Sequence, residues 1–336
     1  MSKKVIIWNY QYEDMKETWK SQMQWLIKAL QGEGYQVLIH PEFKCEGLIN
    51  VGIYDWNKDK DAEIVIYNHT DVSVLIGNIY KAKQNWFFKP TVPDEIHTTL
   101  DKLGYGAYSS ITYKKPPFEQ CKFKETKNFF DTKVKGWIGS KITKWGNIFE
   151  NESVETLEKD YYLVLGQCGG DYVVTQQDFG YYFTKLEQIV KELIRITDKI
   201  IVVKLHPYTD GKLAKDDKLS TSIAEKLRSI DERVKVYLGK INVHSFIENA
   251  RCVILANSGA GFEVMMHHKP IIAWGYPEYH WIAYDLRHLC DLHRALKLDW
   301  FNPNKSDQFL YWYMEKYCYY DQESAQRRVR EILKEK

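Results

Sequence analysis

Short apolar runs that fit buried strands alternate with amphipathic stretches that fit helices along the second half of the chain. The strand patterns lie at 161–165, 199–205, 234–237, 252–256 and 271–273. The helical patterns lie at about 181–197, 220–229, 243–249 and 261–267. This alternation predicts a parallel, doubly wound sheet, because parallel neighbours need a crossover connection that is usually a helix. The ligand crevice of such a sheet lies at the carboxyl ends of its strands.

The first half of the chain opens in the same way. Strand patterns at 4–8, 34–39, 61–67 and 82–88 accompany a helical pattern at 12–31, and the periodicity fades between 113 and 158. A chain of 336 residues is long for a single core. We therefore predict an α/β protein of two Rossmann-like, doubly wound domains, residues 1–155 and 156–304, with an interdomain cleft, which is the GT-B architecture. Helices at about 305–336 are expected to pack back on the first domain.

Charge and cysteine content exclude several kinds of partner. The net charge is only +2, so the chain lacks the broad cationic field on which nucleic-acid binding relies. The six cysteines form no CxxC pair, and residues 1–4 show no signal-peptide pattern, which favours reduced thiols in the cytoplasm. No apolar run is long enough to span a membrane, so any association with the inner membrane is expected to be peripheral.

A His-Pro pair follows the predicted strand 199–205 directly. The imidazole of His206 can donate a hydrogen bond to a phosphate, and Pro207 fixes the backbone where the chain turns away. The alternative is that His206 only caps the strand. The dipeptide alone leaves both interpretations open.

A second turn, Asn257–Gly261, connects a predicted strand to a predicted helix. Gly259 and Gly261 permit a close approach of a ligand, Ser258 supplies a hydroxyl, and backbone amides at a helix start favour a phosphate. Glu263 lies one turn further on and could accept bonds from ribose hydroxyls, or it is an acid favoured by the helix dipole. We rely on the two turns together, because they are less common on strands of one domain than either is alone.

Two further sites carry candidate catalytic groups. Asp171 ends a glycine turn after the strand 161–165, where it could act as a nucleophile or base, or be an ordinary turn aspartate. In the first half, Glu95 and His97 follow a predicted strand and are acid/base candidates, although exposed loop charges are the commoner explanation.

The order of these motifs resembles that of the bacterial retaining β-Kdo glycosyltransferases of capsule and O-antigen assembly. The motifs that carry the resemblance span roughly residues 85–285 and are Lys-Pro-Thr-Val-Pro-Asp-Glu95, Leu-Gly-Gln167 with Asp171, Lys-Leu-His206-Pro207, Asn-Ser258-Gly259-Ala-Gly-Phe-Glu263 and Lys269-Pro270-Ile-Ile-Ala. The His-Pro motif is also shared with other CMP-sugar transferases, including sialyltransferases. The family is therefore better indicated than the sugar.

The resemblance implies a CMP-β-Kdo donor bound by the second domain and a glycan acceptor, oligosaccharide or lipid-linked, bound by the first. It implies double displacement, with Asp171 as the nucleophile that forms a covalent glycosyl-enzyme and Glu95 as the acid/base. Donor-binding positions implied by the resemblance are Gln167, Lys204, His206, Pro207, Ser258, Gly259 and Glu263. Neither a metal ion nor a cofactor is expected. The alternatives are an inverting, sialyltransferase-like CMP-sugar transferase, a non-catalytic sugar-nucleotide or glycan-binding module, and a UDP-sugar epimerase.

Overall fold

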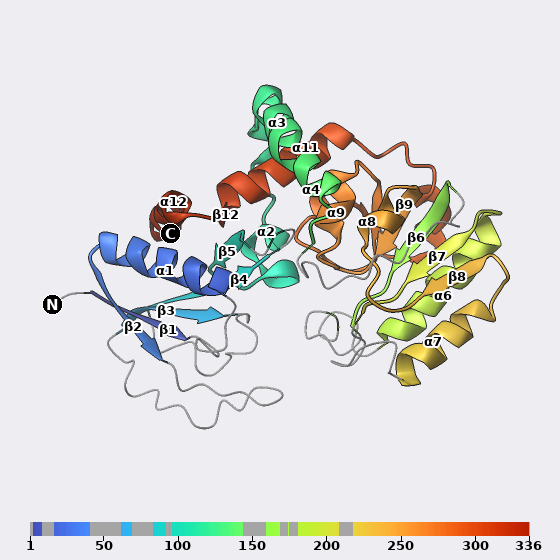
Figure 1. Cartoon of the computed structure of the whole chain (residues 1–336), viewed down its shortest axis with the longest axis horizontal. Coiled ribbons are helices and arrows are strands. Elements are labelled where there is room, and N and C mark those ends of the chain that lie inside the picture. The colour runs from blue at the N-terminus through green and yellow to red at the C-terminus, as the bar shows by residue number, and fades with distance from the viewer. Residues whose placement is uncertain are drawn as a thin grey trace. The chain divides into compact units, whose positions relative to one another are not determined.

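A computed structural model describes residues 3–8, 17–40, 62–68, 83–91, 94, 96–143, 159–168, 174, 181–207 and 218–335. Contacts divide the chain into two compact units (Figure 1): unit 1 comprises residues 1–116 and 312–336, and unit 2 comprises residues 117–311. Residues 117–143 thus belong with unit 2, whereas the domain boundary expected from the sequence lies near residue 155. Among the described helices, none is long and apolar enough to cross a membrane.

Unit 1 is built on a mixed sheet whose strand order is β12-β5-β4-β3-β1-β2. The strands are β1 (Lys3–Trp8), β2 (Tyr35–His40), β3 (Ala62–Asn68), β4 (Gln84–Pro90), β5 (Thr98–Asp101) and β12 (Cys318–Tyr319). The first four are parallel, as predicted, and β5 and β12 add antiparallel pairs at one edge. Helices α1 (Glu17–Gly32) and α12 (Gln322–Lys334) pack against each other, and both contribute buried apolar side chains to the core on this sheet. Segments from the two ends of the chain therefore share one core.

Unit 2 is built on a wholly parallel sheet, in the order β11-β10-β9-β6-β7-β8. Its strands are β6 (Tyr161–Leu165), β7 (Ile201–Lys204), β8 (Val234–Tyr237), β9 (Ala250–Leu255), β10 (Ile271–Ala273) and β11 (Tyr284–Asp285). The helices between them are α6 (Tyr182–Ile196), α7 (Lys218–Arg228), α8 (His244–Ile247) and α9 (Gly261–Met266). In chain order this is the 3-2-1-4-5-6 arrangement of dinucleotide-binding domains, and the direction of winding changes between β6 and β9. The predicted doubly wound α/β fold is confirmed.

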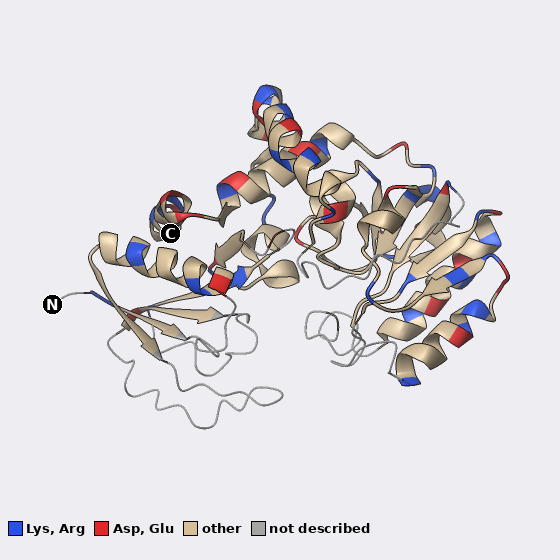
Figure 2. Cartoon of the chain, viewed as in Figure 1, with Lys and Arg blue, Asp and Glu red and all other residues tan. Residues whose placement is uncertain are grey.

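The segment in which no periodicity was found contains a continuous helix, residues 123–139. It consists of α3 (Phe123–Phe129), the π-helical turn η7 (Phe130–Val134) and α4 (Lys135–Gly139), and its lysines are conspicuous in Figure 2. A π-turn inserts an extra residue into the helical repeat, so the apolar positions on either side of it fall out of the 3.6-residue period. This explains why the sequence pattern did not indicate a helix.

The remaining elements are short. They are η5 (Gly106–Tyr108), α2 (Ser110–Tyr113), η6 (Phe118–Gln120), η10 (His280–Ile282), η11 (Leu289–Asp291), α10 (Leu292–Ala295), α11 (Pro303–Trp312) and η12 (Tyr313–Tyr317). Helix α11 lies beside helix 123–139, where the ring of Phe129 meets that of Tyr311 edge-on with centroids 5.6 Å apart.

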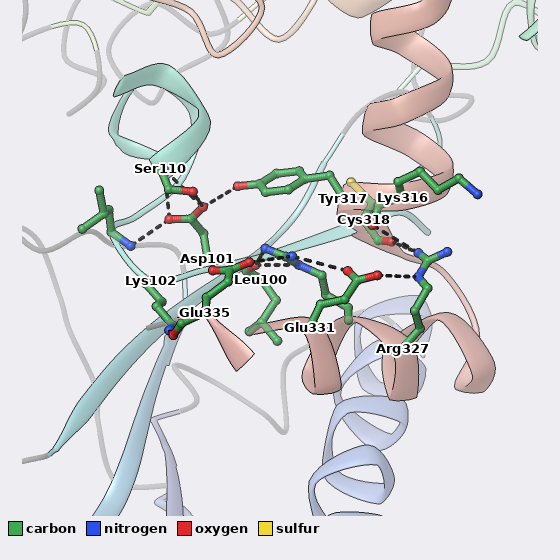
Figure 3. Close-up of polar contacts among 12 residues, drawn as sticks. Leu100, Asp101, Lys102, Ser110, Lys316, Tyr317, Cys318, Arg327, Glu331 and Glu335 are labelled. Atoms are coloured by element: carbon green, nitrogen blue, oxygen red, sulfur yellow. Dashed lines mark hydrogen bonds and ion pairs between the residues drawn. The ribbon is translucent and has the colours of Figure 1, made fainter. Parts of the chain in front are cut away.

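A buried carboxylate joins β5 to the C-terminal segment within unit 1 (Figure 3). Asp101 is 1% exposed and accepts hydrogen bonds from the amide of Leu103 (2.7 Å), the amide of Ser110 (3.0 Å) and the hydroxyl of Tyr317 (2.7 Å). Beside it, the guanidinium of Arg328 donates two bonds to the Leu100 carbonyl, at 2.8 and 3.1 Å. Because a buried carboxylate is stable only when such donors surround it, this cluster ties η12 and α12 to β5.

Replacing Asp101 by alanine should destabilise the protein by about 2–4 kcal/mol, because several buried donors lose their acceptor at once. The midpoint of urea unfolding, followed by circular dichroism, measures this loss. Glu17→Ala is the matched control, since this carboxylate of the same unit is largely exposed and its removal should change stability by no more than about 0.5 kcal/mol. Equal midpoints for the two variants would refute the structural role of Asp101.

Two histidines in unit 2 form a neutral hydrogen-bonded pair beside the end of α9. His244 Nε2 lies 2.8 Å from the Ile142 carbonyl and must donate to it, so His244 Nδ1 accepts from His267 Nε2 at 2.7 Å. Burial lowers the pKa of both rings, and for His267, with His244 and Lys269 also nearby, the pKa falls to about 4. A proton added between the two nitrogens would break this contact.

The pair should make stability depend on pH. An unfolded histidine takes up a proton near pH 6.5 and His267 only near pH 4, so its contribution is complete above pH 6.5 and is lost as the pH falls towards 4. Urea unfolding at pH 7 and pH 5 should therefore show a smaller loss of stability in His267→Gln than in the parent protein. His293→Gln, which alters an exposed ring, should keep the parent's dependence. Parallel pH profiles for the parent and His267→Gln would disprove this assignment.

Candidate functional site

The turns that follow β6, β7 and β9 lie next to one another at the carboxyl edge of the unit 2 sheet. This follows from the pairing, because β6 is hydrogen-bonded to β7 on one side and to β9 on the other. The turns carry Gln167, His206 and Ser258, respectively. The structure thus gathers three of the predicted positions at the point where the winding changes direction, which is where doubly wound domains bind ligands.

The side-chain amide of Gln167 locks two of these turns together. Its Nε2 donates to Asn257 Oδ1 at 2.8 Å, and its Oε1 accepts from the Asn257 amide at 2.9 Å. The turn after β6 also lies tight against β7, since a Cβ at Gly166 would meet the Cα of Leu205 at 3.1 Å. Gln167 is 9% exposed, and its described hydrogen bonds connect the turn after β6 to the turn after β9.

The turn before α9 is closed by its own hydrogen bonds. The amide of Ala260 donates to Ser258 Oγ at 3.2 Å, the amide of Gly261 to the Ser258 carbonyl at 3.1 Å, and the amide of Phe262 to the Gly259 carbonyl at 3.0 Å. Ser258 is partly exposed and Gly259 exposed. The bonds leave the amides of Ser258 and Gly259 without an acceptor among the residues that the structure describes, together with the hydroxyl proton of Ser258. These groups can bind an anion.

Tyr279 supports this turn through both its hydroxyl and its ring. The hydroxyl donates to the Ser258 carbonyl, and the ring lies so close to Gly261 that a Cβ there would come within 2.1 Å of Cζ. Burial first, and then the nearby carboxylates of Glu278 and Glu263, raise the pKa of the Tyr279 hydroxyl, which therefore stays protonated and donates. Glu263 itself is only 3% exposed. Because the Tyr279 ring fills the space beside residue 261, glycine is required there for packing, in addition to the predicted need for a close approach of a ligand.

The ammonium group of Lys204 binds backbone carbonyls of two turns. Its ammonium donates to the carbonyls of Leu205 and Gly239, both at 2.8 Å, and the side chain is 5% exposed. Burial lowers the pKa of this ammonium to about 8. The adjacent His206 is half-buried and Pro207 is buried, so the imidazole is the more accessible group of this turn.

Of the three candidate catalytic residues, only His97 is among the described residues. Asp171 and Glu95 fall outside the described residues, and their roles stay predictions. His97 belongs to unit 1 and is 3% exposed, and its Nδ1 lies 3.0 Å from Asp94 Oδ1. Burial opposes ionisation of Asp94, but the bonds from His97 and the backbone amides keep the pKa of its carboxyl below the usual value. The expectation of an exposed loop charge at position 97 is therefore wrong, since the ring is buried against Asp94 and Tyr320.

Several residues of this edge gave no signal in the sequence. Asn257 was noted only as part of a turn, and Tyr279 and Tyr182, whose hydroxyl accepts from the Gln167 amide at 2.7 Å, were not singled out. The glycine at 261 was the one available clue to a packed neighbour. Within the described part of the chain, no three His, Cys, Asp or Glu side chains are grouped as metal ligands would be.

Residues 122–320, more than half of the chain, match the family described as capsule polysaccharide biosynthesis protein. The chain belongs to this family. The predicted relationship to capsule-assembly proteins is therefore confirmed at the level of the family. No curated protein sequence is significantly similar to the chain.

Two solved structures have the same fold as this member of the capsule family. Both are from Thermosulfurimonas dismutans KpsC. The β-Kdo 2,4-transferase is 16% identical with a TM-score of 0.57, over 88% of this chain and 90% of that one. The β-Kdo 2,7-transferase is 14% identical with a TM-score of 0.52, over 99% of this chain and all of that one. The predicted GT-B fold with two Rossmann-like domains is confirmed, and the predicted cleft between the domains stays a prediction.

Substituting Gly261 by alanine should destabilise the protein by about 1–3 kcal/mol, because the new methyl group must displace the buried ring of Tyr279. Gly136→Ala is the matched control. Gly136 lies in α4, and nothing lies within 4 Å of the position that a Cβ would occupy there, so alanine should be neutral or stabilise the helix by up to about 1 kcal/mol. Thermal unfolding of both variants tests the contrast, and a fully stable Gly261→Ala would show that the ring moves freely.

Proposed function

We propose that the chain is a retaining glycosyltransferase that transfers β-Kdo from CMP-β-Kdo to a glycan acceptor of a bacterial surface polysaccharide. The observation that carries this proposal is the short turn at Ser258 and Gly259, whose outward donors are not used within the turn, near His206 at the carboxyl edge of a doubly wound sheet. Membership in the capsule family and the fold shared with the two KpsC transferases support it.

Unit 2 would hold the donor. The Ser258 hydroxyl, the Gly259 amide and the His206 imidazole would bind the phosphate of CMP, and Glu263 would lie towards the ribose. Gln167 and Lys204 act through the backbone in this proposal, because the described contacts of both side chains hold neighbouring turns. No metal ion is needed to balance one phosphate when hydrogen-bond donors surround it.

Asp171 would be the nucleophile of a double displacement. Its carboxylate attacks the anomeric carbon, the bond from that carbon to the phosphate oxygen breaks, and CMP leaves with the bonding electrons. The acceptor hydroxyl then attacks the same carbon, Asp171 leaves, and Glu95 takes up the hydroxyl proton. Two inversions return the original configuration. His97, held by Asp94, would support the loop that carries Glu95.

Intact-protein mass spectrometry with CMP-β-Kdo tests donor and nucleophile together. We expect an adduct of one Kdo residue on the parent protein and none on Asp171→Ala, because the variant lacks the carboxylate on which the ester forms. Asp160→Ala is the control. Asp160 is an exposed aspartate of unit 2 that pairs with Lys199 and Arg251, and its loss should leave the adduct intact.

The alternatives give different results in the same assay. A product of inverted configuration without an adduct would identify an inverting, sialyltransferase-like enzyme. Binding of CMP without hydrolysis or transfer would identify a non-catalytic module. Calorimetric binding of UDP in preference to CMP would instead favour a sugar-nucleotide epimerase, and would overturn the proposal.

A further inference from the structure

The segment 122–141 concentrates positive charge. It contains six lysines (122, 124, 127, 133, 135 and 141) against Glu125 and Asp131, so its net charge is 6 − 2 = +4. The whole chain has a net charge of +2, which leaves 2 − 4 = −2 for all other residues together. Figure 2 shows basic positions, in blue, along helix 123–139. The segment is therefore a local cationic surface on a chain that is otherwise slightly acidic.

Helix 123–139 has one buried face and one exposed face. Thr126, Phe129 and Val134 are buried, with Phe129 against Tyr311 of α11, and Lys124 and Lys127 are exposed. On the exposed face, the carboxylate of Asp131 receives Lys127 Nζ at 2.5 Å and Lys135 Nζ at 2.7 Å. These bonds lower the pKa of Asp131 to about 2. Asp131 thus aligns Lys127 and Lys135 along the exposed face, and the three groups together keep a net charge of 2 − 1 = +1.

The position of the first lysines is unfavourable for the helix. Lys122 is the N-cap and Lys124 lies in the first turn, where the positive end of the helix dipole repels cations. Phe123 stands between them and is 65% exposed. Neither the exposed ring nor its two cationic neighbours is accounted for by the stability of the fold.

We propose that the exposed face of helix 123–139 docks on the surface of an anionic lipid bilayer. A helix that carries lysines along one face can lie flat on anionic headgroups, and an exposed aromatic ring enters the interfacial layer beside them. Charge complementarity and the Phe123 ring together favour a bilayer over a soluble polyanion, which would satisfy the lysines but leave the ring in water. The surface would hold unit 2 at a membrane whatever reaction the protein catalyses, so the inference does not rest on the proposed transferase activity.

Co-sedimentation of the full chain with lipid vesicles tests this surface. We expect binding to vesicles of phosphatidylcholine mixed with phosphatidylglycerol, much weaker binding to phosphatidylcholine alone, and a steep loss at high salt. The combined variant Lys122→Gln, Lys124→Gln and Lys127→Gln should bind at least about tenfold more weakly. Phe123→Ser should reduce the binding that remains at high salt.

A charge-matched variant separates this face from net charge. Lys218, Lys235 and Lys297 are exposed lysines elsewhere on unit 2, and replacing all three by Gln changes the net charge equally. This variant should bind vesicles as the parent does. Circular dichroism checks that each protein is folded. If the Lys122, Lys124 and Lys127 variant is not folded, the single variants Lys124→Gln and Phe123→Ser take its place.

Three results would overturn the proposal. The first is equal binding of the parent to neutral and anionic vesicles. The second is an equal loss of vesicle binding in the two triple variants. The third is unchanged vesicle binding by Phe123→Ser, together with tight heparin binding by the parent that the Lys122, Lys124 and Lys127 variant loses. The last result would assign the helix to a soluble anionic polymer.

Discussion

The paired amides of Gln167 and Asn257 join the two strands at which the unit 2 sheet changes its direction of winding. In doubly wound sheets the crossover connections leave on opposite faces at this point, which is where ligands bind. Two hydrogen bonds, at 2.8 and 2.9 Å, set the spacing of the turns. The other groups of this edge are placed relative to that spacing, since His206 follows the neighbour of β6 and Ser258 follows Asn257 directly.

Buried polar side chains elsewhere in the chain also hold loops in place through hydrogen bonds. Lys204 holds the turn after β8 through Gly239, Tyr279 holds the Ser258 carbonyl, and Asp101 gathers amides and hydroxyls in unit 1. In each case a side chain that is at most 5% exposed binds backbone or side-chain groups of a loop. A buried donor or acceptor without a partner is costly, so each such group allows few arrangements of its loop. Hydrogen bonds to buried side chains therefore restrict the conformation of these loops, which lack the regular backbone hydrogen bonds of a sheet.

The sequence predicted the parallel strands well and the polar contacts poorly. Strand 161–165 matches the prediction because a fully buried apolar run has few other uses, and strand 234–237 matches because its buried residues alternate with a solvent-facing lysine. The antiparallel β5 was missed because four residues of the type Thr-Thr-Leu-Asp give no periodic signal. Helix 123–139 was missed because the π-turn shifts its apolar face. The role of Lys204 depends on where the Gly239 carbonyl lies, which no local pattern encodes.

The same contacts separate residues that hold the candidate site from residues left to bind a ligand. Gln167, Lys204 and Tyr279 use their polar atoms on neighbouring turns, and each is 9% exposed or less. The Ser258 hydroxyl proton and the Gly259 amide are not used within the turn, and both residues reach solvent. Loss of a holding residue moves a whole turn and so affects folding and binding together, whereas loss of a hydroxyl at Ser258 removes one donor from a turn that keeps its shape. The unequal burial of these polar groups is therefore the physical basis for proposing ligand contacts at the short turn between β9 and α9.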